Sequence, residues 1–310
     1  RAATRPIEAP RESIDVLVAL DPETVAQHRA GLAPGGIVVA DEKAAPADGL
    51  CARVPLAKLA TGLFVNVAAL GVTAALIGLD RSVVLAAVDH HFGVKKPGVA
   101  ESNRQAVEAA YGWAAANPVA SPRLEPVTEP ANRIMLNGNE AIALGALSAG
   151  VRFCAFYPMS PSTSIPLALL KHADEMGVVV EQAEDEIAAI NMAIGASYAG
   201  APAMVTTSGG GFALMAEGVS LAGMTETPVV IVVAQRPGPA TGLPTRTEQA
   251  DLDFVLHAGH GEFPRAVFAP GTIEQCFHLT RKAFEMAERS QGPVFILTDQ
   301  FLADSYRAVE

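Results

Sequence analysis

The sequence predicts an α/β fold of two domains with mostly parallel sheets. Half of the 310 residues are hydrophobic, which is enough to fill two cores. Short apolar runs alternate with helical patterns along most of the chain, and this alternation is typical of βαβ units on a parallel sheet. Between the two alternating parts, residues 117–132 (NPVASPRLEPVTEPAN) contain four prolines and no apolar periodicity. This stretch is therefore expected to be a linker.

The first predicted domain covers residues 1–116 and begins with a βαβ pattern. Its expected elements are a strand at 14–20, a helix opened by residues 21–23 (DPE), a turn at 34–36 that leads into a strand (IVVA), an apolar segment from Leu59 and a helix at 102–116. The order of these elements predicts a small parallel sheet with helices packed against it.

The second predicted domain covers residues 133–310 and repeats the alternation more regularly. Expected helices lie at 139–149, 164–176, 186–199 and 214–224, and expected strands lie at 151–156, 178–181, 203–207, 228–234 and 293–298, with a glycine-rich turn at 208–211. Most of these strands are continuously apolar, which is typical of a parallel sheet covered on both faces. Ligands of such sheets bind beyond the carboxyl ends of the strands, so the loops that follow the strands are where function is expected.

The acidic composition argues against nucleic acid or a membrane surface as the main partner. The net charge is −11 at pH 7 and the pI is near 5.1, whereas both of those partners need clustered Lys and Arg. Cys51, Cys154 and Cys276 lie far apart and form no CxxC pair, so neither a disulfide framework nor a metal cluster is expected. Any iron–sulfur chemistry must come from another chain.

Two uncharged stretches, residues 59–79 and 187–216, are long enough to span a membrane. Both contain Gly, Thr, Ser or Asn throughout, and neither has an aromatic belt, so buried helices are expected instead. The first ten residues have no apolar segment of the signal-peptide kind, and the chain does not begin with Met. We therefore expect a cytoplasmic protein and a processed or truncated chain.

Four loops at the predicted strand ends carry carboxylates, hydroxyls, glycines and one arginine. They read YPMSPSTS after Phe156, EQAEDE after Val180, TTSGGGF after Val205 and QRPGPATGLPTRTEQAD after Ala234. Because the carboxyl ends of parallel strands meet at one edge of a sheet, these groups predict a single site.

The acids Glu181, Glu184, Asp185 and Glu186 allow two interpretations. Acids favour the first turn of a helix, where the macrodipole and the free amide groups stabilise them, and for any one of the four this is the commoner explanation. Glu186, however, begins a helix of apolar and small residues (EIAAINMAIGASYAG), so its carboxylate can point into a closed interface.

The remaining polar groups also leave alternatives open. Residues 208–211 (SGGG) match neither the GxGxxG nor the GxxxxGK[ST] spacing, so a tight turn approached by a cofactor or a partner backbone is preferred to a phosphate cradle. Arg236 follows a buried strand and is expected to pair with a carboxylate, either the protein's own or a substrate's. His257 and His260 lack further ligands and are expected to be loop histidines, so no metal site is predicted in this chain.

The second half of the chain carries five motifs in the order YPMSPSTS, EDEIAAINMAIGASYAG, TTSGGGFALM, MTETPVVIVVAQRPGPATGLPT and PVFILTDQFLADS. Together they resemble the alpha subunit of 2-oxoacid:ferredoxin oxidoreductases, the 2-oxoglutarate type especially, from about residue 137 to residue 305. Residues 1–116 look, more loosely, like the later half of the gamma domain of the same enzymes. The resemblance therefore implies a partial gamma-like domain, the linker, and then a thiamine diphosphate-binding fold of the pyrimidine type at 133–310. It also implies that the family's chain continues beyond Glu310.

The resemblance implies thiamine-dependent oxidative decarboxylation of a 2-oxoacid to acyl-CoA, with electrons passed to ferredoxin. Under it, Glu186 is the catalytic residue. Ser160, Arg236, Thr241 and Thr245 match substrate-binding positions, and Tyr157, Pro158, Ser208 and Gly209 join Glu186 at the cofactor. The family commonly has YPITPSS and SGPG where this chain has YPMSPST and SGGG. Ser160 thus replaces a threonine, and the glycine loop is expected to be looser.

The same resemblance implies several partners. A beta subunit would hold the Mg²⁺–diphosphate site and the [4Fe-4S] cluster, and the assembly would be a dimer of heteromers that uses ferredoxin, coenzyme A and a 2-oxoacid, with 2-oxoglutarate the preferred candidate. This chain has no GDG motif followed by paired asparagines, so by itself it is expected to be inactive. The alternative from another class is a scaffold or assembly subunit that keeps the fold without turnover. A standalone thiamine enzyme of the transketolase kind is a third and weaker interpretation.

Overall fold

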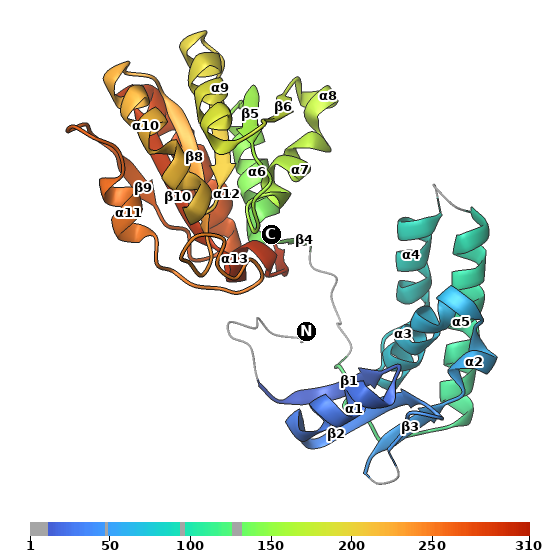
Figure 1. The fold of residues 1–310 in the computed structure, drawn as a ribbon. Coiled ribbons are helices and arrows are strands. Elements are labelled where there is room, and N and C mark those ends of the chain that lie inside the picture. The colour runs from blue at the N-terminus through green and yellow to red at the C-terminus, as the bar shows by residue number, and fades with distance from the viewer. Residues whose placement is uncertain (1–11, 47–48, 94–96, 126–131) are drawn as a thin grey trace. The chain divides into compact units, whose positions relative to one another are not determined.

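A computed structural model of the chain describes residues 12–46, 49–93, 97–125 and 132–310. The chain forms two compact units, Arg1–Pro130 and Ala131–Glu310, and their boundary falls inside the stretch 117–132 that the sequence analysis assigns to a linker. Residues 126–131 of that stretch, and the first ten residues that are not expected to be a signal peptide, lie outside the described part. Each unit is considered by itself (Figure 1).

The first unit is built on a parallel sheet of three strands in the order β1-β2-β3. The strands are β1 (Ile14–Ala19), β2 (Leu32–Asp41) and β3 (Cys51–Val54). The turn expected at 34–36 is wrong, because these residues belong to β2. Ile14 pairs with Leu32 and Val16 pairs with Ile37, so β2 bulges between the two pairs, and Gly35 takes the positive φ of 81° that the bulge needs.

Helices cover this sheet. They are α1 (Pro22–His28), α2 (Leu56–Leu59), α3 (Val65–Leu76), α4 (Arg81–Phe92) and α5 (Pro97–Ala116), with single 3₁₀ turns at Arg29–Gly31 and Gly62–Phe64. The carboxylate of Asp21 caps α1 by accepting a hydrogen bond from Thr24 N at 2.8 Å. The uncharged segment from Leu59 folds into short helical pieces with a buried face, and no helix in the described ranges is both long and apolar enough to cross a membrane.

The second unit contains a sheet of six parallel strands in the order β6-β5-β7-β8-β10-β9. These strands are β5 (Phe153–Phe156), β6 (Val179–Gln182), β7 (Ala203–Thr207), β8 (Val229–Gln235), β9 (Ala266–Phe268) and β10 (Pro293–Asp299). A separate antiparallel pair is formed by β4 (Ile134–Leu136) and β11 (Arg307–Val309). The parallel α/β class expected from the apolar runs is confirmed.

The helices of the second unit fall on the two faces of the sheet. They are α6 (Gly138–Ser148), α7 (Ser164–Leu170), α8 (Ala173–Met176), α9 (Glu186–Tyr198), α10 (Gly209–Met224), α11 (Leu252–His257), α12 (Ile273–Ser290) and α13 (Gln300–Asp304). One core joins the sheet to α6, α7 and α12, and the other joins it to α9, α10 and α11 (Figure 1). The inner strands β5, β7, β8 and β10 are therefore shielded on both sides, which explains their continuous hydrophobicity, whereas the edge strand β6 is mostly exposed.

Three helical expectations need correction. The glycine-rich turn at 208–211 is wrong, because α10 begins at Gly209, five residues before the expected start. The single helix expected at 164–176 is interrupted and forms α7 and α8. The 18-residue helix α12 was not expected, although its apolar residues recur at helical spacing and its charged residues lie on the outer side.

Candidate active site

The polar loops meet at the carboxyl edge of the six-stranded sheet, which we define as the ends of β5, β6, β7, β8 and β10. Tyr157 and Pro158 directly follow β5 and are exposed, and the side chain of Ser160 is also exposed. The Ser160–Pro161 peptide bond is cis. Tyr157 and Ser160 therefore lie at the exposed side of this loop, whereas Ser162 is buried and its Oγ donates to Met159 O.

Arg236 connects this loop to the end of β8. The residue is 9% exposed, and its Nη1 donates a hydrogen bond to the backbone carbonyl of Ser160 at 2.6 Å. Within the described ranges no carboxylate lies at ion-pair distance from it, and burial lowers the pKa of its guanidinium. Pairing with one of the protein's own acids, one of the two interpretations of the sequence, is therefore not what this structure contains.

Asn139, a buried residue of α6, holds the same loop from the other direction. Its Nδ2 donates hydrogen bonds to Pro161 O and to Ser164 Oγ, both at 2.7 Å. The residue was not predicted as part of the site. The only sequence signal was its place in NGNEA, where Asn137 and Glu140 form a capping box at the start of α6. Two neighbouring carbonyls of the loop, those of Ser160 and Pro161, are thus fixed by separate donors.

Among the four clustered acids, Glu186 alone is buried. Its exposed fraction is 4%, whereas Glu181, Glu184 and Asp185 are exposed. Asp185 is the N-cap of α9 and accepts from Ala188 N at 2.7 Å, so the helix-capping explanation holds for this acid. No hydrogen bond to the Glu186 carboxylate occurs within the part of the chain that the structure describes. The Glu186 carboxylate is therefore buried beside the start of α10 without a hydrogen bond from the described residues.

The residues 208–211 form the start of a helix that other groups approach closely. Ser208 is fully buried, and its Oγ finds no hydrogen-bond partner in the described residues. A side chain at Gly209 would collide with the carboxylate of Asp251, since a Cβ there would lie 2.5 Å from Oδ1. Burial, aided by Glu248, raises the pKa of Asp251. Glycine is thus required here by neighbouring side chains and not by a turn.

A pocket of about 250 Å³ lies at this helix start. It is lined by Gly209, Gly210, Ala213, Arg236, Pro237, Gly238, Pro239, Ala240 and Asp251. It brings together two residues predicted from the sequence, Arg236 and Gly209, together with one that was missed, Asp251. Arg236 and the N-terminus of α10 favour an anionic group in this pocket, and the Asp251 carboxylate opposes one when it is ionised.

Thr241 and Thr245 lie in the long loop between β8 and α11, and both are exposed. The loop is tied at its far end, where Gln249 Nε2 donates to Asp299 Oδ2 at 2.6 Å and Asp251 N donates to Gln235 Oε1 at 2.9 Å. Neither threonine lines the pocket. These two predicted residues therefore lie on the exposed loop, outside the lining of the pocket.

Of the two histidines expected in a loop, His260 lies in one and His257 does not. His257 is the last residue of α11, and its Nδ1 lies 2.7 Å from Asp253 O, while His260 follows in the loop. Among the described residues there is no group of three His, Cys, Asp or Glu side chains that could hold a metal ion.

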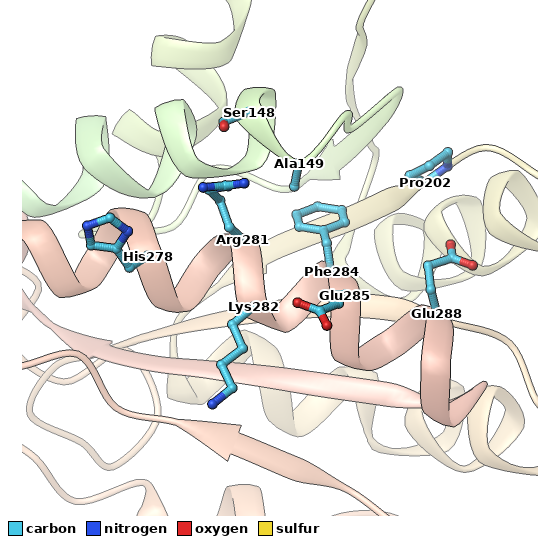
Figure 2. A pocket seen from close by; sticks show the side chains of 9 residues that line it. All are labelled: Ser148, Ala149, Pro202, His278, Arg281, Lys282, Phe284, Glu285 and Glu288. Atoms are coloured by element: carbon cyan, nitrogen blue, oxygen red, sulfur yellow. The ribbon is translucent and has the colours of Figure 1, made fainter.

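A larger hollow of about 570 Å³ lies elsewhere, where α12 passes the starts of the strands (Figure 2). It is lined by Ser148, Ala149, Pro202, His278, Arg281, Lys282, Phe284, Glu285 and Glu288. This surface of α12 carries two cations, Arg281 and Lys282, and two acids, Glu285 and Glu288, and Glu285 already pairs with Arg289 at 3.4 Å. The mixed charges select no single class of ligand.

Comparisons with known proteins agree on one kind of enzyme. The family model described as pyruvate flavodoxin/ferredoxin oxidoreductase, thiamine diphosphate-binding, matches residues 144–310, and a pyruvate ferredoxin/flavodoxin oxidoreductase model matches residues 1–113. The alpha subunit of 2-oxoacid:ferredoxin oxidoreductase 1 from Sulfurisphaera tokodaii is 39% identical over 83% of this chain and 42% of its own length. The 2-oxoglutarate synthase subunit KorA from Archaeoglobus fulgidus is 43% identical over 56% of this chain and 51% of its own length.

A solved structure is also similar. It is the 2-oxoglutarate:ferredoxin oxidoreductase from Magnetococcus marinus with 2-oxoglutarate, coenzyme A and succinyl-CoA bound. It matches with a TM-score of 0.88 and 33% identity, over 99% of this chain and 56% of the other. The chain thus spans about half the length of the relatives it matches.

Proposed function

This chain belongs to the thiamine diphosphate-binding family of pyruvate flavodoxin/ferredoxin oxidoreductases, and on that premise we propose that it is an alpha-type subunit of a 2-oxoacid:ferredoxin oxidoreductase. The proposed substrate is 2-oxoglutarate, which the names of several relatives and the ligands of the similar structure support. One observation carries the proposal: a buried carboxylate, Glu186, lies at the same sheet edge as a buried arginine, Arg236, that has no acid at ion-pair distance among the residues the structure describes.

The setting of Glu186 fits the pyrimidine half of thiamine diphosphate. A carboxylate that shares a proton with a ring nitrogen must be shielded from water, and Glu186 is buried with no competing hydrogen bond among the described residues. When bound, thiamine diphosphate supplies the nucleophilic carbon that attacks the 2-oxo group and stores the electron pair left by carbon dioxide. Glu186 is the residue of this chain that would hold the proton at the pyrimidine. Tyr157, Pro158, Ser208 and Gly209 are the proposed contacts around it.

Arg236 is the proposed anchor of the substrate carboxylate. Its Nη1 is engaged by Ser160 O, and the guanidinium has further donors in a fixed fork that matches a carboxylate. Because the side chain is buried, an anion bound there is attracted more strongly than it would be in water. The hydroxyls of Ser160, Thr241 and Thr245 are the proposed polar margin of the same pocket.

The remaining components of the reaction are proposed to belong to other chains. A beta subunit would carry Mg²⁺ with the diphosphate half of the cofactor and the [4Fe-4S] cluster, and ferredoxin and coenzyme A would be the electron and acyl acceptors. Exposed apolar side chains beside Glu186 support an interface with that subunit; they are Ile187 and Met192 on α9 and Leu214 and Leu221 on α10. A dimer of such heteromers in the cytoplasm is the proposed assembly.

The test is Glu186→Gln in the enzyme assembled with its beta subunit. The amide keeps the shape of the side chain and cannot hold the proton, so exchange of the cofactor's C2 proton with solvent should be abolished. Glu184→Gln is the matched control, since this acid is exposed on the same loop and its variant should exchange normally. Near-normal exchange in Glu186→Gln would contradict a catalytic role and favour a scaffold subunit. Coenzyme A-dependent reduction of a one-electron dye with a panel of 2-oxoacids then identifies the substrate.

A further inference from the structure

Helices α9 and α10 approach each other through two glycines of α10. A Cβ at Gly218 would lie 2.7 Å from Ile190 Cγ2, and a Cβ at Gly211 would lie 2.7 Å from Glu186 Oε1 and 2.8 Å from Glu186 Cγ. The two helices lie on the same face of the sheet (Figure 1). Gly211 and Gly218, which are two turns apart on α10, therefore lie against the side chains of Glu186 and Ile190, which are one turn apart on α9.

Neither glycine is required by the backbone. Gly211 in the first turn of α10 and Gly218 in its interior have no positive φ, so their backbone conformation would accept alanine. What excludes a side chain is the neighbour. At Gly218 the neighbour is an apolar core residue, Ile190. At Gly211 the nearest atom is Thr207 Oγ1, and the next is Oε1 of Glu186, the carboxylate to which we assign proton transfer.

The space at Gly211 is also closed from its own helix start. A Cβ there would collide with Thr207 Oγ1 as well as with Glu186, and Thr207 is fully buried at the end of β7. A carboxylate displaced by a methyl group would not find room on the Thr207 side. It would have to move away from both Gly211 and Thr207.

We infer that Gly211 is a positioning residue for Glu186: the missing side chain creates the space that sets the place of the carboxylate. This inference rests on the proposed role of Glu186 only for its catalytic consequence, because the packing itself is independent of the reaction. Gly218 is the matched position at which the same substitution disturbs only packing.

The packing is tested first by a double-mutant cycle on the full chain, with thermal unfolding as the measurement. Gly211→Ala should lower Tm, because an added methyl group overpacks a closed site. In the Glu186→Ala background the same substitution should lower Tm by clearly less, with the remaining loss due to Thr207. Gly218→Ala, in the wild-type and Glu186→Ala backgrounds, should show no such coupling. Equal losses for Gly211→Ala in both backgrounds would overturn the inference.

The chemical consequence is tested by exchange of the C2 proton in the assembled enzyme loaded with thiamine diphosphate. Gly211→Ala should slow exchange by about 100-fold, since a displacement of about 1 Å at a reacting group can cost that much. Gly218→Ala should lose stability and keep an exchange rate near that of the wild type. Equal slowing by the two variants would overturn the positioning role. Normal exchange in Glu186→Gln, with the coupling in Tm intact, would instead show that the packing inference stands and the proposed function fails.

Discussion

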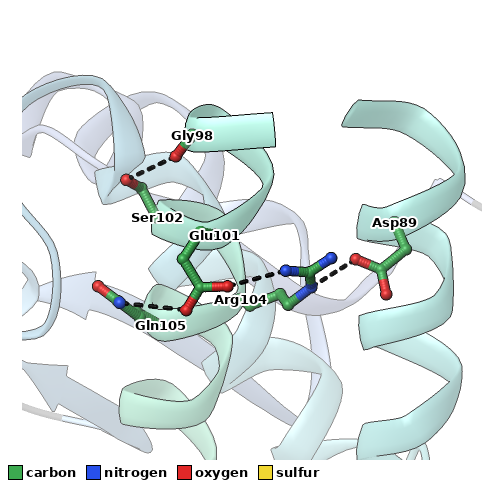
Figure 3. Close-up of polar contacts among 6 residues, drawn as sticks. All are labelled: Asp89, Gly98, Glu101, Ser102, Arg104 and Gln105. Carbon is green, nitrogen blue, oxygen red and sulfur yellow. Dashed lines mark hydrogen bonds and ion pairs between the residues drawn. The ribbon is translucent and has the colours of Figure 1, made fainter. Parts of the chain in front are cut away.

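Two arginines, one in each unit, show opposite uses of the same side chain. Arg104 on α5 is partly exposed, and it donates from Nε to Asp89 Oδ1 at 2.6 Å and from Nη1 to Glu101 Oε2 at 2.8 Å (Figure 3). Those two carboxylates raise the pKa of its guanidinium. Arg236 is buried, donates to the carbonyl of Ser160 and has its pKa lowered by burial.

The difference lies in what neutralises the charge. Arg104 is neutralised by acids of its own unit and links α4 to α5 at the surface, where solvent and salt weaken the link. Arg236 is buried, and no carboxylate in the described part of the chain lies at ion-pair distance from it, although Asp251 lines the same pocket; an anion that binds there would therefore be favoured. Fully paired surface charges therefore indicate structure, and a buried charge kept without its counter-ion indicates a binding site.

The largest effect on kcat/KM should come from removing the guanidinium group of Arg236. Arg236→Met keeps the approximate volume and removes the donors, so kcat/KM for the 2-oxoacid should fall by about 10- to 100-fold, as expected for a hydrogen bond to a charged group. Because the buried charge is also removed, Tm should change little or rise. Steady-state kinetics of the assembled enzyme and thermal unfolding provide the measurements. An unchanged kcat/KM would mean that the carbonyl of Ser160 is the true partner of Arg236.

The sequence predicted the second unit better than the first, and the reason is physical. Buried parallel strands such as β8 and β10 are continuous apolar runs, which few other structures produce. In the first unit, β2 contains a bulge around Gly35. Because Pro and Gly are typical of turns, the sequence predicted a turn where the strand in fact continues. The start of α10 was missed for the same reason, since three glycines read as a turn although side chains packed against them require their presence.

The site residues that the sequence predicted are those whose role can be recognised from their own short segment of chain. Glu186 and Arg236 were found because a charge beside a long apolar segment is conspicuous. Asn139 and Asp251 were not found, because the residues they lie against are far away in the chain. Such contacts cannot be predicted from the spacing of residues in the sequence. The burial that separates Glu186 from the exposed Glu184 is likewise a property of packing.

A smaller effect should separate two serines of the loop after β5. Ser160 is exposed and its hydroxyl has no hydrogen bond in the described residues, whereas Ser164 Oγ accepts from Asn139 Nδ2. Ser160→Ala should lower kcat/KM by about 2- to 10-fold, the range for a neutral hydrogen bond, and leave Tm unchanged. Ser164→Ala should instead lower Tm, because a buried donor loses its acceptor. A fall in Tm for Ser160→Ala would show that this serine only shapes the loop.

A pH-dependent effect is expected at Asp251. Burial, followed by the charge of Glu248, raises its pKa in the folded chain. Below the unfolded pKa of about 3.9 the group is protonated in both states and has no effect on stability. As the pH rises through the higher folded pKa, the unfolded chain releases the proton more readily, so stability is lost and stays lost above that pKa. Asp251→Asn should therefore raise Tm at pH 7 and have no effect at pH 3, whereas Asp253→Asn, at an exposed acid of α11, should bring no such gain at pH 7. A gain for Asp251→Asn of the same size at both pH values would contradict the burial argument.

The smallest effect is expected at Arg104, where the first unit provides the control for the second. Its two ion pairs are solvent-exposed, so Arg104→Met should leave Tm nearly unchanged at 0.15 M salt and the remaining difference should shrink at about 1 M, where the Debye length falls to about 3 Å. kcat/KM should not change, because the exposed charges of Asp89 and Glu101 bind no substrate. A loss of kcat/KM comparable with that of Arg236→Met would mean that pairing with nearby acids does not distinguish a structural arginine from a binding one. Thermal unfolding at two salt concentrations, set beside the kinetics, measures both sides of that comparison.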